Sequence, residues 1–480
     1  MSPDSPPPTV APSAPLTRDT GSTLAEQLAF RYGERIRQRL LPAGARLPSV
    51  RECARRHGVS PSTVVAAYDQ LLAQGLVEAR RQRGFFVREW RGHDLGRRAE
   101  PVASTRQPPV DATALIRGMF QDGAMAAPGM GALPAEWLDL PLLHTALRRA
   151  MAAEARGQHR MSSLQYGHPA GDPGLREVLA HRLGDIGIAC TPAQVLTSVG
   201  ATHGLDVVSR VLLQPGDAVL VDEPGWAVEY ARLTRMGMRL LPVPRGPLGP
   251  DLDAMRALLQ AHKPRLYVTV SVFHNPTGCS LPLAAAHQVL KLAEAHGLVI
   301  VEDDSYTHLA PPHAPRLSAL DGLQRTVYVS GFSKILAPNW RVGFVAASKA
   351  LTERFIDMKL LSALTTPALP EQAIAWCIAQ GHLHRHAERI QQRLATARGR
   401  SERLAMASGC RFVTPPQGLF GWVDVGTDTE TLAQRMMDDG WLLAPGALFH
   451  ATRRPTNLMR INFATSQDPS FWAALKAYAN

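Results

Sequence analysis

The chain has 480 residues, of which 45% are hydrophobic and 19% are charged, a composition typical of a globular protein with two or more domains. It has no apolar run of the ~18 residues that a membrane span requires and no apolar signal-peptide core. Its five scattered cysteines form no Cys-x-x-Cys pair, which argues against a disulfide framework or a zinc site and fits a reducing cytoplasm, where we expect the protein.

Positive charge is concentrated at the N-terminal end of the chain. Residues 1–100 hold 16 Arg and 10 Asp or Glu, which accounts for +6 of the total formal charge of +11. A basic region attached to a nearly balanced body indicates a polyanionic partner for that region. An arginine-rich surface that serves solubility alone is the alternative.

The first elements expected along the chain are helices. Residues 1–20 are rich in Pro and Ser and lack periodicity, so we predict a disordered leader. Apolar residues at helical spacing predict a helix over residues 23–40. Ser49 is placed to cap a second helix that runs to His57, and Ser60 to cap a third. Two helices joined by a tight turn at Gly58 form a helix-turn-helix pattern.

A basic hairpin follows the third helix. Residues 80–87 read Arg-Arg-Gln-Arg-Gly-Phe-Phe-Val, which we interpret as the wing of a winged helix. The start of the third helix would enter the major groove of double-stranded DNA, and arginines would contact phosphates. A small three-helix module that binds no nucleic acid is the alternative. The candidate DNA-binding residues are Arg51, Ser60, Ser62, Thr63, Arg80, Arg81 and Arg83.

Several short motifs in this region resemble the GntR winged-helix family of bacterial repressors. They are L-P-S-V-R at residues 47–51, G-V-S-P-S-T-V at 58–64, A-Y at 67–68 and G-F-F-V at 84–87. At residues 81–84 the sequence R-Q-R-G replaces the R-x-G-S-G wing that is usual in that family. We assign the DNA-binding domain to residues 21–90 and a Pro/Gly/Arg-rich flexible linker to residues 91–114.

From residue 115 to 480 the pattern changes to apolar strands alternating with helices. This alternation predicts an α/β domain with a largely parallel sheet. A long helix after about residue 382, followed by two strands that flank another helix, predicts a smaller α+β subdomain. The expected strands cover residues 195–199, 218–222, 266–270, 298–302, 326–330, 341–346, 418–425 and 458–463.

Residues that suit chemistry follow the expected strands, and in an open α/β sheet ligands bind at the carboxyl ends of strands. Residues 200–204 are a Gly-Ala-Thr-His-Gly helix start that suits an anion, and Trp226 follows the next strand. Asn275 precedes a proline, and Asp303 follows the fourth strand. Taken singly, each has an ordinary alternative: a common helix start, a core tryptophan or a turn-capping carboxylate.

The fifth strand leads into Ser330-Gly-Phe-Ser-Lys334, with Arg341 seven residues on. A desolvated lysine amine can form a Schiff base, and the neighbouring hydroxyls and arginine suit a phosphate. A surface lysine at a helix start is the alternative. Arg460 lies in an apolar strand, where an arginine is expected to be buried only if it meets a carboxylate.

The order of these motifs resembles class I aminotransferases, which are fold-type I enzymes that use pyridoxal 5′-phosphate (PLP). Asn-Pro-Thr-Gly at 275–278, Asp-x-x-Tyr at 303–306, Ser-x-x-Ser-Lys at 330–334, Arg341 and Arg460 carry the resemblance. It implies that Lys334 holds PLP as an internal aldimine, that Asp303 pairs with the pyridine nitrogen, and that Arg460 binds a substrate or effector carboxylate. The implied catalytic residues are Lys334, Asp303 and Tyr306. The implied cofactor-binding residues are Lys334, Asn275, Asp303, Tyr306, Ala201, Thr202, Trp226, Ser330, Ser333, Arg341 and, from a second subunit, Tyr166.

A winged helix joined to an aminotransferase-like domain resembles the MocR subfamily of transcriptional regulators. The fold class that we expect is a winged helix-turn-helix joined to an α/β fold-type I PLP-dependent transferase domain. The resemblance implies a homodimer that reads two half-sites of an operator and senses PLP or an amino compound. Two alternatives stay open: an active aminotransferase with a secondary DNA-binding domain, and a regulator whose second domain only dimerises.

Overall fold

The computed structural model describes residues 16, 22–37, 40–80, 83–88, 126–157, 164–452 and 454–479. The predicted linker, and the predicted leader apart from Leu16, lie outside these residues. The chain separates into two compact units. One comprises Met1–Ala127 with Glu430–Ala444, and the other comprises Pro128–Thr429 with Pro445–Asn480.

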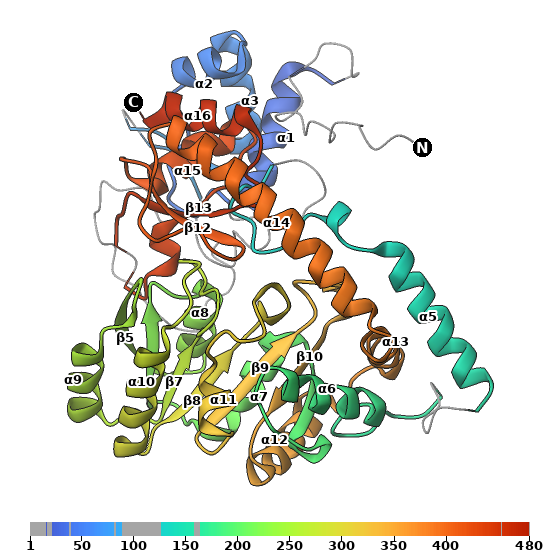
Figure 1. Ribbon diagram of the computed structural model, residues 1–480. Helices are drawn as coiled ribbons and strands as arrows, with labels where there is room; N and C mark the ends of the chain where they lie inside the picture. Colours follow the sequence, from blue (N-terminus) through green and yellow to red (C-terminus); the bar gives the residue numbers. More distant parts are fainter. Residues whose placement is uncertain are drawn as a thin grey trace. The chain divides into compact units, whose positions relative to one another are not determined.

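The first unit contains a winged helix-turn-helix, drawn in blue in Figure 1. Its elements are α1 (Leu24–Arg37), α2 (Val50–His57), α3 (Pro61–Ala73), β1 (Val77–Arg80) and β2 (Gly84–Val87). The caps fall where the sequence predicts them: Ser49 Oγ accepts from the Glu52 N–H at 3.3 Å, and Ser60 Oγ from the Thr63 N–H at 3.1 Å. Gly58 ends α2 in the left-handed region (φ 64°), so the predicted turn is confirmed.

The helices of this unit pack around a small apolar core that includes Leu28, Tyr32, Val64 and Tyr68, each at most 1% exposed. β1 and β2 pair in antiparallel register, which gives the predicted wing. Asp438 of α15 (Thr429–Asp438) forms ion pairs with Arg35 and Arg56 of the same unit.

The second unit is built on an eight-stranded sheet in the order β3-β10-β9-β8-β7-β4-β5-β6. β4, β5, β7, β8 and β9 run parallel, whereas β10 pairs antiparallel with both β3 and β9. The strands are β3 (Val195–Val199), β4 (Ala218–Glu223), β5 (Arg239–Gly246), β6 (Gly249–Pro250), β7 (Leu266–Thr269), β8 (Val299–Asp303), β9 (Thr326–Gly331) and β10 (Val342–Ala346).

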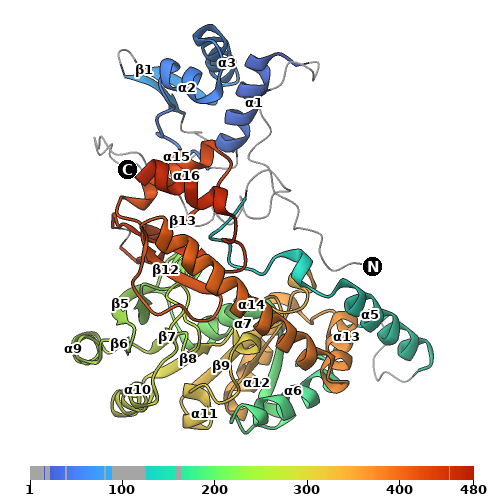
Figure 2. The ribbon, with the colours of Figure 1, turned by 45° about the horizontal axis from the view of Figure 1, so that its top comes forward.

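Helices cover both faces of this sheet, as Figures 1 and 2 show. α7 (Gly200–Leu212), α8 (Ala227–Arg235) and α12 (Lys349–Ala363) contribute to one apolar core. α9 (Leu252–His262), α10 (Leu283–His296) and α11 (Leu317–Asp321) contribute to the core of the opposite face. The second unit also contains α5 (Leu140–Ala155), α6 (Pro173–Asp185) and α13 (Ala368–Ala379).

A smaller four-stranded sheet follows in the order β11-β12-β14-β13. Its strands are β11 (Arg411–Phe412), β12 (Phe420–Asp424), β13 (Ala444–Pro445) and β14 (Leu458–Asn462), accompanied by α14 (His382–Ala407) and α16 (Pro469–Ala479). Short 3-10 helices lie at Ala135–Trp137, Pro192–Gln194, Thr307–Leu309, Pro338–Trp340 and Gly446–Phe449. Among the described residues, no helix combines the length and apolarity needed to cross a membrane.

Candidate ligand site at the carboxyl ends of the strands

The sequence-predicted site residues come from loops at the carboxyl ends of neighbouring strands. Ala201 and Thr202 follow β3, Trp226 follows β4, Asn275 follows β7, and Lys334 follows β9. Because β4, β7, β8 and β9 run parallel, their carboxyl ends meet at one edge of the sheet. Topology therefore gathers residues that are far apart in sequence.

Lys334 carries an amine with a perturbed pKa. Burial lowers the pKa of Lys334 to about 8, with the positive charges of Arg460 and Arg341 acting in the same direction and Asp303 opposing them. Its Nζ donates a hydrogen bond to the carbonyl of Gly131 at 2.6 Å. This lowered pKa increases the unprotonated fraction of the amine, the form that acts as a nucleophile, while the ammonium still predominates at neutral pH.

Asp303 ends β8 with its side chain buried, 8% exposed. Its Oδ1 accepts hydrogen bonds from the Ser305 amide at 3.0 Å and the Ser305 hydroxyl at 2.6 Å. Burial, with a smaller contribution from the nearby carboxylate of Glu229, raises the pKa of Asp303 to about 6, although the hydrogen bonds from Ser305 act in the opposite direction. Within the described part of the chain Asp303 makes no salt bridge, so a cationic ring nitrogen would supply the missing charge.

Arg341 and the start of α7 form a compact cationic cradle. Gly200 has φ of 74°, and a Cβ added there would lie 2.4 Å from Arg341 Nη2. Arg341 Nη1 donates to Ser333 Oγ at 3.1 Å. First-turn N–H groups, a hydroxyl and a guanidinium together suit a phosphate. Ser330, which the sequence also predicts at this site, has a buried hydroxyl that donates to the Asp304 carbonyl at 2.8 Å.

Trp226 and Asp303 line a small cavity of about 30 Å³ together with His274 and Glu229. Tyr306 lies nearby, 5% exposed, with its ring edge-on to Phe420 at a centroid distance of 5.4 Å. Burial raises the pKa of Tyr306, and its hydroxyl interacts with the Asn275 side chain. A planar ring with a phenolic oxygen would find an aromatic face, a carboxylate and two polar groups here.

Arg460 carries a buried guanidinium that meets no carboxylate among the residues that the structure describes. It is 5% exposed, and its Cζ lies 4.5 Å and 4.9 Å from the ring centroids of Phe420 and Phe449. Its Nη1 donates to Asn275 Oδ1 and its Nη2 to the Gly129 carbonyl, both at 2.7 Å. Its buried Nε has no hydrogen-bond partner within the described part of the chain. Burial lowers the pKa of Arg460 to about 10. These features suit recognition of a carboxylate.

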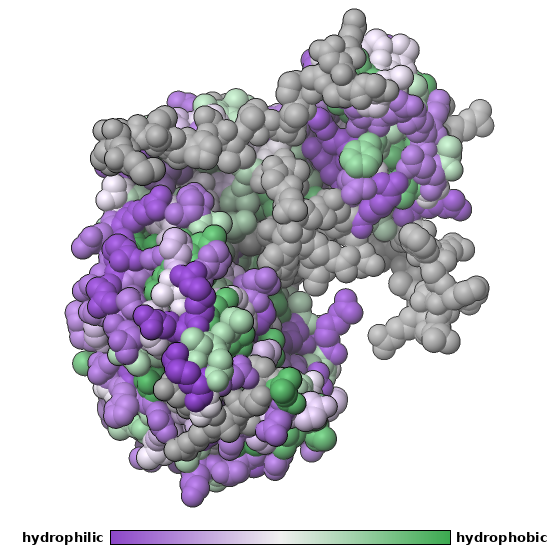
Figure 3. All heavy atoms as spheres, turned by 90° about the vertical axis from the view of Figure 1, so that its right-hand side faces the viewer, coloured by the Kyte–Doolittle hydropathy of each residue, from purple (hydrophilic) through white to green (hydrophobic). Residues whose placement is uncertain are grey.

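Tyr166, which we expected from a second subunit, is 77% exposed. Leu164 and Leu361 are also large apolar side chains with high exposure, at 94% and 85%. Figure 3, which views the side of the molecule where α5 lies, shows apolar side chains in patches between hydrophilic ones. Exposed apolar patches of this kind are typical of protein–protein contacts.

Sequence reasoning missed the segment Pro128–Leu133. Two of its backbone carbonyls accept hydrogen bonds from the side chains of Lys334 and Arg460. Its only signal is the spacing of Gly129 and Gly131 shortly after the predicted linker. Carbonyl contacts of this kind leave no pattern in the side chains. Sequence reasoning also missed Glu229, which lies on α8 and whose effect on Asp303 arises from tertiary packing.

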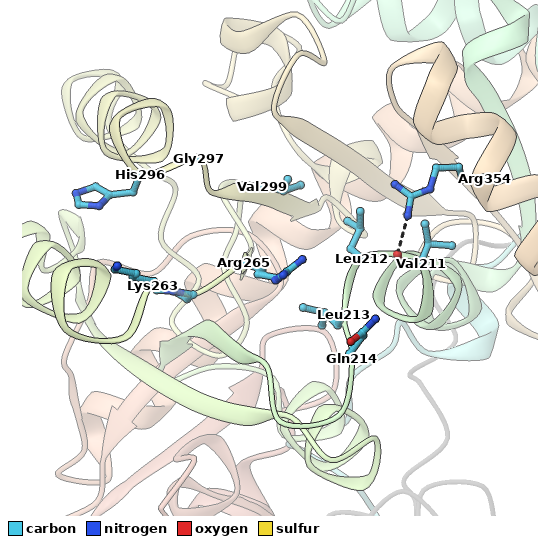
Figure 4. Close-up of a pocket in the computed structure, with 11 residues that line it drawn as sticks. Val211, Leu212, Leu213, Gln214, Lys263, Arg265, His296, Gly297, Val299 and Arg354 are labelled. Atoms are coloured by element: carbon cyan, nitrogen blue, oxygen red, sulfur yellow. Dashed lines mark hydrogen bonds between the residues drawn. The ribbon is translucent and has the colours of Figure 1, made fainter.

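A larger pocket of about 430 Å³ lies at the opposite edge of the sheet (Figure 4). Exposed Lys263, Arg265, His296 and Arg354 line it. α7 and α10 end in this pocket, where carbonyls carry negative partial charge, and Arg354 Nη2 donates to the Val211 carbonyl at 3.1 Å. Arg354 therefore has a structural role at the end of α7, and the pocket contains none of the predicted cofactor residues.

The candidate DNA-binding residues differ in how they are engaged. Arg51, Ser62 and Arg83 are exposed. The Ser60 hydroxyl is used as a cap, and the Arg80 guanidinium pairs with Glu78 at 2.8 Å. Arg81 lies outside the described residues. Sequence reasoning missed Arg46, which is exposed and whose backbone forms an isolated β-bridge with Phe86 of β2. Its side chain adds a positive charge beside the wing.

Comparison with known families matches both parts of the chain. Residues 24–87 match the family described as bacterial regulatory proteins, gntR family, and residues 139–476 match aminotransferase class I and II. A 2-aminoadipate transaminase of Thermus thermophilus is 31% identical over 70% of this chain and 84% of the relative. The uncharacterized HTH-type transcriptional regulator YjiR of Escherichia coli is 29% identical over 95% of this chain and 97% of the relative.

Among solved structures, the α-aminoadipate aminotransferase LysN of Thermus thermophilus superposes with a TM-score of 0.69 at 26% identity. The match covers 76% of this chain and 94% of the LysN chain. The LysN structure is a complex with N-(5′-phosphopyridoxyl)-L-leucine.

Proposed function

The chain belongs to the class I and II aminotransferase family and, through its GntR-type helix-turn-helix, to the MocR subfamily, and we propose that it regulates transcription by sensing PLP or an amino compound. Its cofactor is PLP. We place it in the cytoplasm, where bacterial DNA lies, and infer that it acts as a homodimer on two half-sites.

The observation that carries this proposal is a group of buried charges that lack counter-charges. The amine of Lys334 has a pKa of about 8, Asp303 is buried without a salt bridge, and the Arg460 guanidinium meets no carboxylate among the described residues. Burying unpaired charges costs free energy, so a group of such residues indicates a site that a ligand completes. PLP and an amino acid carry the complementary groups.

When bound, PLP supplies a ring that withdraws electrons from a substrate carbon. In our proposal Lys334 would hold the cofactor through its amine and could move a proton at that carbon. Asp303 would pair with the ring nitrogen, and Asn275 and Tyr306 would hydrogen-bond the phenolic oxygen. Ala201, Thr202, Ser333 and Arg341 would bind the phosphate, with Tyr166 of the second subunit, and Trp226 would offer an aromatic face to the ring.

Arg460 would give the site its preference for an amino compound with a carboxylate. The aromatic faces of Phe420 and Phe449 exclude water from the guanidinium, which strengthens its interaction with an anion. The unpartnered Nε leaves a donor for that anion. An amino acid is therefore favoured over a simple amine as effector.

The proposal is tested by titrating PLP, with and without amino acids, against purified full-length protein bound to the DNA immediately upstream of its own gene. We expect specific binding whose affinity shifts in the wild type and not in Lys334→Ala. Lys349→Ala, which changes an exposed lysine at the start of α12, is the matched control. If the protein binds the DNA specifically but its affinity does not change with PLP or any amino acid, the proposed sensing is contradicted. If it does not bind the DNA specifically, the proposal that it regulates transcription is contradicted.

A catalytic aminotransferase is the second candidate, favoured by the 31% identity to a named transaminase. The same residues would then turn over an amino donor and a 2-oxo acid. A coupled assay of the PLP-loaded protein decides it: sustained turnover supports the enzyme, whereas a single half-reaction with no turnover supports the sensor.

A further inference from the structure

We propose that the segment Pro128–Leu133 reports ligand occupancy of the Lys334 site to the DNA-binding part of the chain, and that Asn462 is the residue that positions this segment. The inference rests on the proposed function and names the route of its regulation. The segment follows directly on the chain after residues 88–127, which join it to the winged helix.

The segment is held by the two cations that a ligand would use. Lys334 Nζ donates to the Gly131 carbonyl at 2.6 Å, and Arg460 Nη2 donates to the Gly129 carbonyl at 2.7 Å. Both are charge-assisted hydrogen bonds, which are roughly twice as strong as neutral ones. The ligand site and this stretch of backbone therefore share their strongest donors.

A second set of contacts comes from Asn462 at the end of β14. Its Nδ2 donates to the carbonyls of Met130 at 2.8 Å and Ala132 at 2.7 Å, and its own amide donates to the Pro128 carbonyl at 2.7 Å. Its Oδ1 accepts from the Ala464 amide at 2.9 Å, which fixes the orientation of the side chain. Asn462 thus contacts three residues of the segment and is fully buried.

Ligand binding changes the first set of contacts and leaves the second in place. When the Lys334 amine condenses with the carbonyl carbon of PLP, the carbonyl oxygen leaves as water and Nζ keeps at most one N–H, so the ammonium that donates to Gly131 is lost. A carboxylate on Arg460 brings two negative oxygens beside the Gly129 carbonyl, which repels them. Occupancy therefore loosens the cationic hold on Gly129 and Gly131 while Asn462 keeps the segment in place.

The experiment measures hydrogen–deuterium exchange of the peptide that spans residues 126–133 in full-length protein. Without PLP, Lys334→Ala should raise its exchange rate by about tenfold because a charged hydrogen bond is lost, and Lys349→Ala should not. PLP should raise exchange in the wild type and leave Lys334→Ala unchanged. Equal exchange in the wild type and Lys334→Ala would overturn the contact with Gly131, whether or not the protein binds PLP.

Coupling is tested with Asn462→Ala, against Asn457→Ala, an exposed asparagine that precedes the same strand. Asn462→Ala should take up PLP as the wild type does, judged by absorbance, yet lose most of the shift in DNA affinity on adding PLP or an amino acid. A full shift in Asn462→Ala would overturn the coupling. If the wild type takes up PLP but shows no shift, sensing and coupling both fail. If it takes up no PLP, the proposed function fails and the coupling fails with it, while the exchange experiment still decides the contact between Lys334 and Gly131.

Discussion

The winged helix and the ligand site differ in whether their polar side chains find partners within the protein. On the winged helix the Ser60 hydroxyl is shared with Ser62 and Thr63, and Arg80 pairs with Glu78, all near the surface. In the ligand site Asp303 and Arg460 are buried, and within the described chain neither meets an opposite charge in a salt bridge. Groups satisfied within the protein explain its fold, whereas buried groups left unsatisfied indicate what it binds.

The difference also sets how strongly each region should respond to mutation. Exposed cations interact with phosphates through water and salt, so each contributes a modest, screened amount. Buried cations act at low dielectric, so removing one changes both ligand affinity and the pKa of its neighbours. We therefore expect large effects in the site and small ones on the winged helix.

The largest effect is expected for Lys334→Ala. Without the amine no covalent bond to PLP forms, so borohydride reduction should add no cofactor mass to the protein in intact-mass measurements. Lys349→Ala should gain one cofactor per chain, as the wild type does. A reducible adduct on Lys334→Ala would show that another lysine holds PLP, and the buried Lys359, with a pKa lowered to about 8, would be the next to examine.

Arg341→Ala should weaken PLP binding by about tenfold to a hundredfold, since hydrogen bonds to charged groups contribute ~1.5–3 kcal/mol. The expected cause is loss of the phosphate contact beside Ser333. Equilibrium dialysis measures it. Arg354→Ala, at the opposite edge of the sheet, is the control and should bind PLP normally. If Arg341→Ala bound PLP with wild-type affinity, the proposed role of Arg341 in binding the phosphate would be contradicted.

The pH dependence of PLP capture should reveal the effect of Arg460 on the pKa of Lys334. In the wild type the initial rate should rise with pH and level off above the Lys334 pKa of about 8, because only the unprotonated amine reacts. Arg460 lowers this pKa, so Arg460→Met should shift the midpoint upward and slow capture at neutral pH. Arg411→Met, at an exposed arginine, should keep the wild-type midpoint. A downward shift would contradict the assigned sign.

On the winged helix, Arg83→Ala should weaken DNA binding a few-fold and reduce the slope of log affinity against log salt by about 1, the value for one phosphate contact. Arg80→Ala should have a smaller effect, because Arg80 is already paired with Glu78. Fluorescence anisotropy over a salt series measures both. Equal effects would mean that Arg80 leaves Glu78 on binding DNA.

Much of this architecture is predictable because its signals are local. Ser49 and Ser60 mark helix starts, and β3 and α14 begin and end where apolar pattern and breakers place them. β5 was not predicted, since Pro242 and Pro244 interrupt its pattern and only the short β6 lies beyond it in the sheet. The order of motifs identified the site residues by resemblance.

What the sequence cannot reveal depends on contacts between distant segments. The Ser330 hydroxyl donates to the Asp304 carbonyl, and Lys334 Nζ donates to the Gly131 carbonyl. Both contacts depend on tertiary packing, which leaves no periodic pattern in the sequence. The pKa shifts of Lys334 and Asp303 likewise depend on burial and on charges far away in sequence, such as Arg460 and Glu229. Motifs thus locate reactive residues, and the fold determines their chemistry.

The smallest effect concerns Ser60, whose hydroxyl accepts from the Thr63 amide. Ser60→Ala should lower the stability of the winged helix by about 1 kcal/mol through loss of the cap, measured by chemical denaturation. Ser62→Ala removes a neighbouring exposed hydroxyl and keeps the cap, so any loss of DNA affinity without loss of stability belongs to direct contact. If Ser60→Ala left stability unchanged and weakened DNA binding, the hydroxyl would serve DNA rather than the helix, and the contrast between the two regions would have to be redrawn.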